Sequence, residues 1–184
     1  MQSVKFSLQW TIATFGGFIL SLLLVEVGEK PDIGVIQGAF GGLVVAFAQA
    51  FVLRERIINP WLWVFSSLAG WVLITSGGIG AVGWIVFTTQ VLALRVIYGA
   101  VLGAIAGFGM GLAHWLAIQQ DIPLAWQWIL VSSISWALGA AIGSAVGLFL
   151  HQLTQLFLGE VMGLAATWLV VSILTGVNAY RILK

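Results

Sequence analysis

Six apolar runs of about twenty residues, separated by short polar breaks, constrain this chain more than any other feature. They cover approximately residues 7–26, 33–53, 61–80, 96–117, 126–149 and 156–178. About 20 apolar residues in a helix cross the hydrocarbon core of a bilayer. The runs are too long for barrel strands and lack their alternation. The sequence therefore predicts an all-α, polytopic membrane protein with six transmembrane helices.

The composition supports this prediction. Only 7% of the 184 residues are charged and 61% are hydrophobic, whereas a soluble domain carries about 25% charged residues. The net charge of +1 offers no basic surface for nucleic acid, and the chain has no cysteine for disulfides or thiolate metal sites. We expect a single integral membrane domain over residues 1–184 that is surrounded by the lipid bilayer.

Basic residues predict the orientation of the chain in the membrane. With a cytoplasmic N-terminus, five of the seven basic residues are also cytoplasmic: Lys5, Arg54, Arg56, Arg181 and Lys184. Cytoplasmic loops of membrane proteins carry the excess of Lys and Arg, so we expect both termini in the cytoplasm. The N-terminal region has no small-residue cleavage motif, which favours a retained first span over a signal peptide.

Tryptophans gather at the cytoplasmic ends of the predicted helices. They are Trp10, Trp61, Trp63, Trp126 and Trp128. Tryptophan is enriched at membrane–water interfaces, because its ring is apolar and its N–H is polar. We interpret the five as an aromatic belt in lipid rather than as a cofactor site.

The chain contains an internal repeat. A shift of 65 positions carries Gln49 to His114 and Ser67 to Ser132, without a gap over about 39 positions. The stretch WTIATFGGF, which begins at Trp10, aligns with WVFSSLAGW and WILVSSISW and indicates a third, weaker copy. We therefore expect three helical hairpins, the third of them degenerate.

Glycines spaced four apart run along two of the predicted helices. They are Gly38 and Gly42 in the first copy and Gly99, Gly103, Gly107 and Gly111 in the second. Residues at this spacing share one helix face. Small residues on such a face let two backbones approach closely in lipid, so we expect these glycines to pack helices together.

A polar side chain ends each glycine series, Gln49 in the first copy and His114 in the second. Their distances from the turns place Gln49 level with Ser67 and His114 level with Ser132. One interpretation, which the sequence favours, is that each pair forms an interhelical hydrogen bond, worth about 0.6 kcal/mol on average in membranes. The other is that these residues and Thr14 converge at one depth and bind a head group, a substrate or a chlorophyll magnesium.

Two ionisable residues lie near the outer ends of the predicted helices. Arg95 opens the fourth run and Glu160 lies one turn into the sixth. For the arginine, snorkelling to the interface is the favoured interpretation, whereas an intramembrane acid is by default a functional hypothesis. A pair between the two residues would satisfy both charges, and we keep both as candidate binding residues. Segment 79–94 is apolar but too short to cross, and we expect an interfacial helix that caps the outer side.

No sequence motif typical of an enzyme is present. The chain has no G-x-S-x-G, no H-E-x-x-H and no glycine-rich loop ending in Lys-Ser or Lys-Thr. Its histidines, His114 and His151, have no carboxylates nearby in sequence, so no metal site is predicted. We expect a non-enzymatic protein without catalytic residues.

The glycine series followed by Q-A-F-V-L-R at Gln49 and by S-x-x-G-W resembles a group of small bacterial membrane proteins with six spans. Members carry a helix that ends in Q-W-L-x-L-R, and many come from photosynthetic bacteria. Gln49, Leu53 and Arg54 match in the first copy, and Trp115 and Leu116 in the second, which departs at the glutamine and arginine of the pattern. The resemblance implies a bacterial inner or thylakoid membrane and this topology, but no activity.

Two functions are compatible with these features. The first is an interaction, assembly or accessory subunit that packs against a larger membrane complex. The second is a module that binds or transports a small molecule, a lipid or a pigment through the cytoplasmic-side polar residues. Scarce intramembrane charge argues against an ion-coupled pump. The sequence favours the first function.

Overall fold

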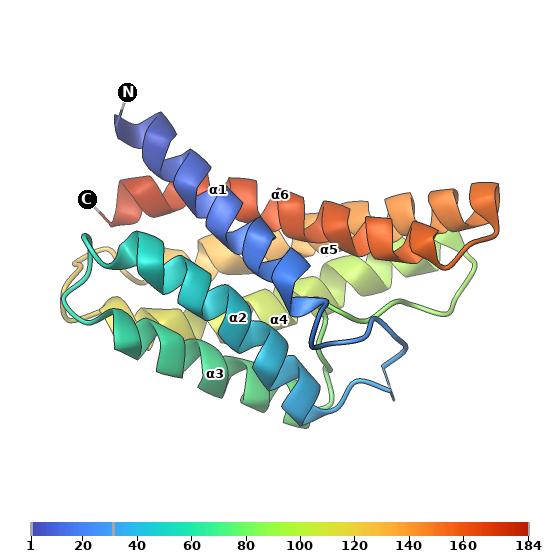
Figure 1. The fold of residues 1–184 in the computed structure, drawn as a ribbon, viewed down its shortest axis with the longest axis horizontal. Helices are drawn as coiled ribbons and strands as arrows, with labels where there is room; N and C mark the ends of the chain where they lie inside the picture. The colour runs from blue at the N-terminus through green and yellow to red at the C-terminus, as the bar shows by residue number, and fades with distance from the viewer. Residues whose placement is uncertain (1, 31, 184) are drawn as a thin grey trace.

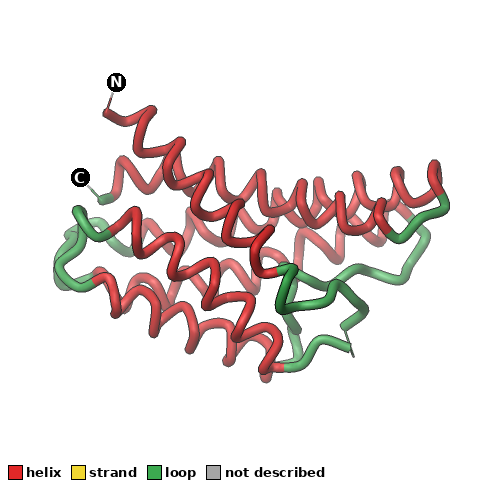
Figure 2. The backbone as a smooth tube through the Cα atoms, viewed as in Figure 1, coloured by secondary structure: helices red, strands yellow, loops and turns green. Residues whose placement is uncertain are grey.

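The computed structural model describes residues 2–30 and 32–183, and that part of the chain contains six helices (Figure 1). They are α1 Gln2–Ser21, α2 Val35–Leu53, α3 Pro60–Ser76, α4 Leu92–Ile118, α5 Gln127–Thr154 and α6 Leu158–Ile182. Loops join them, and two of the connections are long, the one described over 22–30 and 32–34 and the one over 77–91 (Figure 2). Lys184, one of the basic residues that predict the orientation, lies outside the described residues.

The helices form a closed ring. Each helix packs against the next one in the chain, and α6 packs against α1. Both termini lie at one end of the ring together with the connections 54–59 and 119–126, and we call this end the base (Figures 1 and 2). Segments 22–30, 32–34, 77–91 and 155–157 lie at the opposite end, which we call the top. Because the ring is closed, one face of every helix is turned toward a common axis.

The outer surface of the ring is apolar. Large side chains such as Phe47, Phe65, Phe108 and Ile134 are between 49% and 60% exposed on four different helices. Four helices, α2, α4, α5 and α6, are long and apolar enough to cross a membrane, while α3 is apolar but has 17 residues. The architecture is that of an all-α membrane protein.

Helix ends differ from the predicted runs where the local chain geometry changes. The first helix ends at Ser21 rather than near 26, and the Ser21 hydroxyl donates to Phe18 O at 2.6 Å. The third ends at Ser76 rather than 80, because Gly77 follows and then Gly78 with a φ of 83°. By contrast, α5 continues past 149 and stops only at Thr154.

Segment 77–91 is not the interfacial helix that the sequence predicts. The predicted segment 79–94 is not helical before Leu92, where α4 begins. Residues 82–84 form only a turn, in which Trp84 N–H donates to Ala81 O at 2.8 Å, and residues 80–86 are buried. The reason lies in the helix lengths: α1, α2 and α3 have 20, 19 and 17 residues, whereas α4, α5 and α6 have 27, 28 and 25. The short helices leave volume at the top of the ring, and the apolar segment gains more burial there than it would at the membrane surface.

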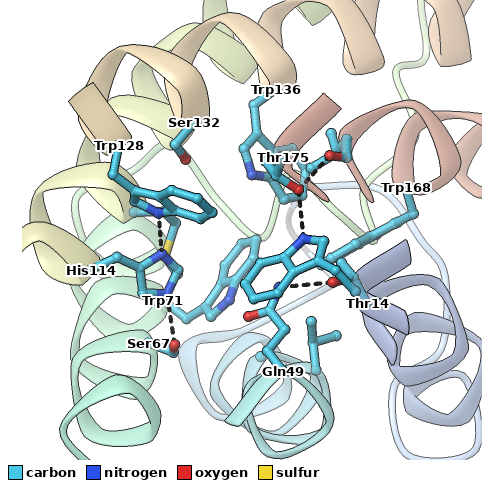
Figure 3. A pocket seen from close by; sticks show the side chains of 15 residues that line it. Thr14, Gln49, Ser67, Trp71, His114, Trp128, Ser132, Trp136, Trp168 and Thr175 are labelled. Atoms are coloured by element: carbon cyan, nitrogen blue, oxygen red, sulfur yellow. Dashed lines mark hydrogen bonds between the residues drawn. The ribbon is translucent and has the colours of Figure 1, made fainter. Parts of the chain in front are cut away.

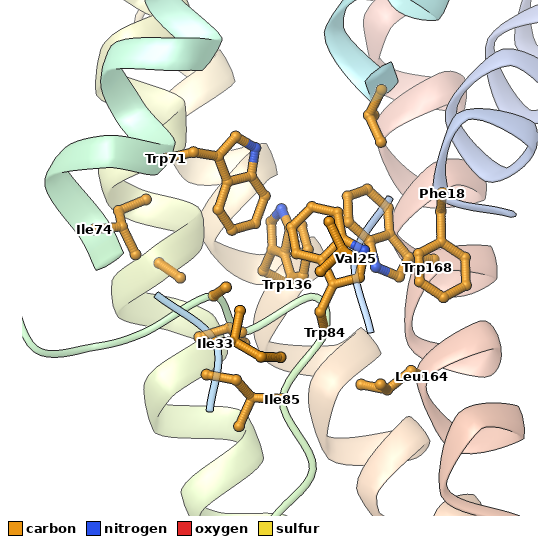
Figure 4. Packing of buried hydrophobic residues seen from close by; sticks show 14 of the residues in the cluster. Phe18, Val25, Ile33, Trp71, Ile74, Trp84, Ile85, Trp136, Leu164 and Trp168 are labelled. Atoms are coloured by element: carbon orange, nitrogen blue, oxygen red, sulfur yellow. The ribbon is translucent and has the colours of Figure 1, made fainter. Parts of the chain in front are cut away.

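Trp84 anchors this segment inside the ring. Its side chain is fully buried, and its indole N–H donates to the Ser21 hydroxyl at 2.8 Å. The N–H of Trp168 donates to the carbonyl oxygen of Gly83 at 2.8 Å. Figure 4 shows Trp84 among the indoles of α3, α5 and α6. The segment is therefore held by two buried hydrogen bonds as well as by apolar contact.

The glycines of α4 lie directly against the backbone of α5. A Cβ atom at Gly107 would lie 2.6 Å from Ser132 O, and one at Gly111 would lie 2.7 Å from the Cα atom of Ile129. At Gly99 the nearest backbone atom is Ala140 O, at 2.7 Å. No side chain larger than hydrogen fits at these positions without moving α5.

The glycines of α2 have different neighbours. Gly42 faces the ring of Trp71, and a Cβ atom at Gly41 would lie 2.5 Å from the ring of Trp84. A Cβ atom at Gly38 would lie 3.0 Å from the hydroxyl oxygen of Thr75. On this helix the missing side chains therefore make room for indole rings and a hydroxyl rather than for another backbone.

Candidate functional site

Three tryptophans meet on the ring axis near the base. Trp10 of α1, Trp63 of α3 and Trp128 of α5 are at most 2% exposed. Their ring centroids lie 5.5–5.8 Å apart and all three pairs are edge-to-face, the geometry that indoles prefer. We call them the tryptophan triad. The predicted lipid belt is wrong for these three, and only Trp61 and Trp126, 60% and 50% exposed, face outward.

Each indole N–H of the tryptophan triad donates to a polar side chain on an even-numbered helix. The bonds are Trp63 Nε1 to Gln49 Oε1 (3.1 Å), Trp128 Nε1 to His114 Nδ1 (3.2 Å) and Trp10 Nε1 to Thr175 Oγ1 (2.9 Å). An indole N–H only donates, so each of these bonds identifies an acceptor. Nδ1 of His114 is therefore unprotonated, and its ring proton is on Nε2.

Gln49 and His114 also bond to the odd-numbered helix on their other side. Gln49 Nε2 donates to Thr14 Oγ1 at 3.1 Å, which links α2 to α1. His114 Nε2 donates to Ser67 Oγ at 2.8 Å, and the Ser67 hydroxyl donates in turn to Trp63 O at 2.7 Å. The His114 ring stacks on that of Trp63 at 3.8 Å. Each of these polar side chains thus ties together two neighbouring helices.

The predicted pairs Gln49–Ser67 and His114–Ser132 are wrong. The N–H of Trp63 occupies the carbonyl oxygen of Gln49, which turns the amide nitrogen toward α1 and away from Ser67. In the same way, His114 directs its acceptor nitrogen to Trp128 and its donor nitrogen to Ser67. Equal distance from a turn sets the depth of two residues, but not the direction in which their side chains point.

Thr175 has the corresponding place on α6, but its short side chain bonds to only one neighbouring helix, α1. It accepts from Trp10 and donates to Val171 O, at 2.7 Å, within its own helix. No hydrogen bond to the Ser132 hydroxyl occurs within residues 2–30 and 32–183, although Ser132 is only 4% exposed. Thr175 could have been identified from the sequence, because it lies three steps of four residues after Gly163 and so belongs to the same row of the helix surface.

These polar side chains surround a cavity of about 40 Å³, which we call the axial cavity (Figure 3). Each helix contributes one of them: Thr14, Gln49, Ser67, His114, Ser132 and Thr175. Within the described part of the chain, no charged side chain lines the axial cavity. Its volume is sufficient for a few water-sized groups.

Indole rings close the axial cavity at both ends. Trp10 and Trp128 of the tryptophan triad lie on the side of the base. On the side of the top lie Trp71, Trp136 and Trp168, the last two edge-to-face at 4.9 Å (Figure 4). The enclosed space has no room for a chlorophyll, and both nitrogens of His114 are occupied by hydrogen bonds. The structure therefore gives no support to a pigment at this place.

Arg95 and Glu160 form the pair that would satisfy both charges, so the arginine does not snorkel to the interface. Arg95 Nη2 contacts Glu160 Oε2, and the two residues are 1% and 7% exposed. Arg95 lies in the first turn of α4 and Glu160 in the first turn of α6, near the top. Neither residue lines the axial cavity, so the sequence-predicted site residues divide into two separate groups.

The bond between His114 and Ser67 predicts energetic coupling. We expect His114→Leu and Ser67→Ala each to lower the free energy of unfolding in detergent by about 0.5–2 kcal/mol. The double variant should lose less than the sum of the two, since the first substitution already removes the bond. His114→Leu combined with Ser132→Ala is the control and should be additive. Coupling to Ser132 in place of Ser67 would contradict these hydrogen bonds.

No family model, curated protein or solved structure matches this chain. Its function is therefore inferred from the closed ring, the tryptophan triad and the axial cavity. These features combine a membrane-embedded scaffold with a small, enclosed and uncharged polar site on the scaffold's own axis.

Proposed function

We propose that this chain is a membrane protein that binds small uncharged polar solutes in the axial cavity and passes them along the ring axis. One observation carries the proposal: every helix contributes a polar side chain to the same buried cavity. A bundle that serves only as an accessory subunit needs hydrogen bonds between neighbouring helices, but no convergence of all six on one space. The geometry therefore favours the transport alternative over the interaction role.

Size and charge define the class of solute. The axial cavity of about 40 Å³ holds at most roughly three non-hydrogen atoms. No charged side chain on its described wall stabilises an ion, and a buried ion without a partner is strongly disfavoured. The free Ser132 hydroxyl supplies both a donor and an acceptor. Water, ammonia and hydrogen peroxide have the required size and chemistry.

Passage requires the indole rings to move. The edge-to-face contacts of the tryptophan triad contribute only about 0.5–1.5 kcal/mol per pair beyond their burial. Rotation of one indole toward the base also breaks its N–H bond to the neighbouring helix, which costs about a further 0.5–1.5 kcal/mol, and opens the axial cavity. We propose that the structure is the closed state and that the tryptophan triad is the inner gate.

The proposal includes six spans built from three helical hairpins. The residues that align between the copies, Trp10, Trp63 and Trp128, form one cluster, and each donates to the helix that precedes it in the ring. In the closed ring, α1 and α3 each lie between two helices that are long enough to cross a membrane, which supports a membrane-spanning position for both. The excess of basic residues at the base supports a cytoplasmic base.

A permeability measurement tests the function. Proteoliposomes with the wild-type chain should take up water, ammonia or hydrogen peroxide faster than protein-free vesicles in stopped-flow experiments. Ser132→Leu fills the axial cavity and should abolish the increase. Ser66→Leu is the matched control, because Ser66 neighbours Ser67 on α3 but does not line the axial cavity.

The possible results separate the two functions. An increase that Ser132→Leu removes and Ser66→Leu leaves intact supports the axial route. Wild-type permeability equal to that of empty vesicles for all three solutes contradicts it. If the gently purified protein then retains partner chains, the accessory-subunit hypothesis is supported instead.

Cysteine labelling tests the proposed topology. Cysteines at Glu55 and Gln120, both exposed at the base, should react with an impermeant maleimide only from the cytoplasmic side. Cysteines at Gln90 and Gln152, exposed at the top, should react only from the opposite side. Labelling of a base position from outside would reverse the orientation, and labelling of base and top from one side would exclude the six-span arrangement.

A further inference from the structure

The Arg95 guanidinium has more hydrogen-bonding capacity than its surroundings use. Nη2 is paired with Glu160, but Nε and Nη1 are fully buried and have no partner within the described part of the chain. A buried N–H group without a partner is strongly unfavourable. The Arg95 side chain is 2% exposed, so bulk water does not reach it.

A second, smaller cavity lies beside these nitrogens. Its volume is about 20 Å³, and its polar wall is formed by Arg95, Glu160, Ser144 and Thr167. The Ser144 side chain is 9% exposed, and no described residue forms a hydrogen bond with it. The Thr167 hydroxyl already donates to Gly163 O at 3.2 Å. Arg95 and Ser144 therefore supply three free donor groups to one small space.

The electrostatic balance at this cavity is positive. The charges of Arg95 and Glu160 cancel each other. Both residues lie in the first turn of a helix, α4 and α6 respectively, and each helix N-terminus carries about half a positive charge. No other charged side chain lines the cavity within the described residues. A water molecule would satisfy the donors but leave this positive charge uncompensated.

We infer that Arg95, Ser144 and the paired Glu160 form a binding site for one monatomic anion, of which chloride is the biological example. The free donors require an acceptor, and the helix N-termini favour a negative charge. The volume of about 20 Å³ excludes carboxylates, phosphate and sulfate. The anion completes the contacts of the guanidinium and fixes the N-termini of α4 and α6 against α5. This site is independent of the solute route through the axial cavity.

Chloride-dependent stability tests the inference. The melting temperature of the purified chain in detergent is measured while sodium gluconate is replaced by sodium chloride at constant ionic strength. The wild type should be stabilised as chloride rises. Ser144→Ala removes one donor to the anion and should raise the midpoint chloride concentration about tenfold or more. Ser133→Ala is the matched control on α5, because the Ser133 hydroxyl already donates to Ala104 O at 2.9 Å.

Bromide locates the ion directly. Anomalous diffraction from crystals grown in sodium bromide should show a peak between the Arg95 guanidinium and the Ser144 hydroxyl. An unchanged melting temperature in chloride would mean that water fills the cavity, and would overturn the inference. So would equal chloride midpoints for Ser144→Ala and Ser133→Ala, or a bromide peak elsewhere only, since both place the ion outside this cavity.

Discussion

Arg95→Leu is expected to lower the free energy of unfolding by about 3–5 kcal/mol, because it leaves the carboxylate of Glu160 buried without its partner. Glu160 is 7% exposed, so water cannot replace the guanidinium. The pair also joins α4 to α6, two helices that are not neighbours in the ring. Reversible unfolding in mixed detergent micelles measures the loss.

The double variant Arg95→Leu/Glu160→Leu separates the broken pair from lost packing. With both charges absent, its stability should return to within about 1–2 kcal/mol of the wild type, since apolar replacements of buried pairs are often neutral or stabilising. Arg54→Leu is the surface control. Arg54 approaches Glu55 at 4.0 Å with more than half of its side chain exposed, so its loss should change stability by at most about 1 kcal/mol. A double variant as unstable as Arg95→Leu alone would show that Glu160 is not the partner that matters.

The pairing of Arg95 with Glu160 could be considered from charge alone, although the sequence favours snorkelling to the interface for the arginine. Arg95 directly precedes the fourth apolar run and Glu160 lies one turn into the sixth, both close to the outer side. Each benefits from a counter-charge in a medium that water does not enter. The all-α membrane class follows from the same kind of argument. Run length and apolar composition leave no other way to satisfy the backbone.

The tryptophan triad could not be distinguished from a lipid belt by position along the helix. A tryptophan near a helix end suits the interface and the ring axis equally well. The available signal is angular: Thr14 lies four residues after Trp10, and Ser67 four after Trp63. Residues at this spacing share a helix face, so a tryptophan that accompanies a buried hydroxyl points inward.

The burial of segment 77–91 was not predictable from its own residues. The composition of an apolar, glycine-containing stretch of this length suits a membrane surface and the inside of a ring equally well. The decisive quantity is the difference in length between α1–α3 and α4–α6, which depends on where each helix stops. Those stops are set by single residues such as Gly78, whose φ of 83° ends the regular backbone geometry.

The contact between α5 and α6 predicts the other large effect on stability. A Cβ atom at Gly163 would lie 2.5 Å from Gly143 O and 2.6 Å from the Cα atom of Gly147. Both of these atoms belong to the backbone, so no rotamer change relieves the overlap. Gly163→Leu must therefore push α6 away from α5, which separates the Glu160 end of α6 from its neighbours as well.

We expect Gly163→Leu to lower the free energy of unfolding by at least about 3 kcal/mol, at the upper end of overpacking effects. Gly16→Leu on α1 is the matched control, because no atom lies within 4 Å of a Cβ atom built there. Leucine is intrinsically favoured over glycine in a helix by up to about 1 kcal/mol, so the control should be neutral or slightly stabilised. The two substitutions should change the free energy of unfolding differently because the facing backbone lies close to Gly163 but not to Gly16. Similar losses at Gly163 and Gly16 would mean that helix packing at this crossing does not determine stability.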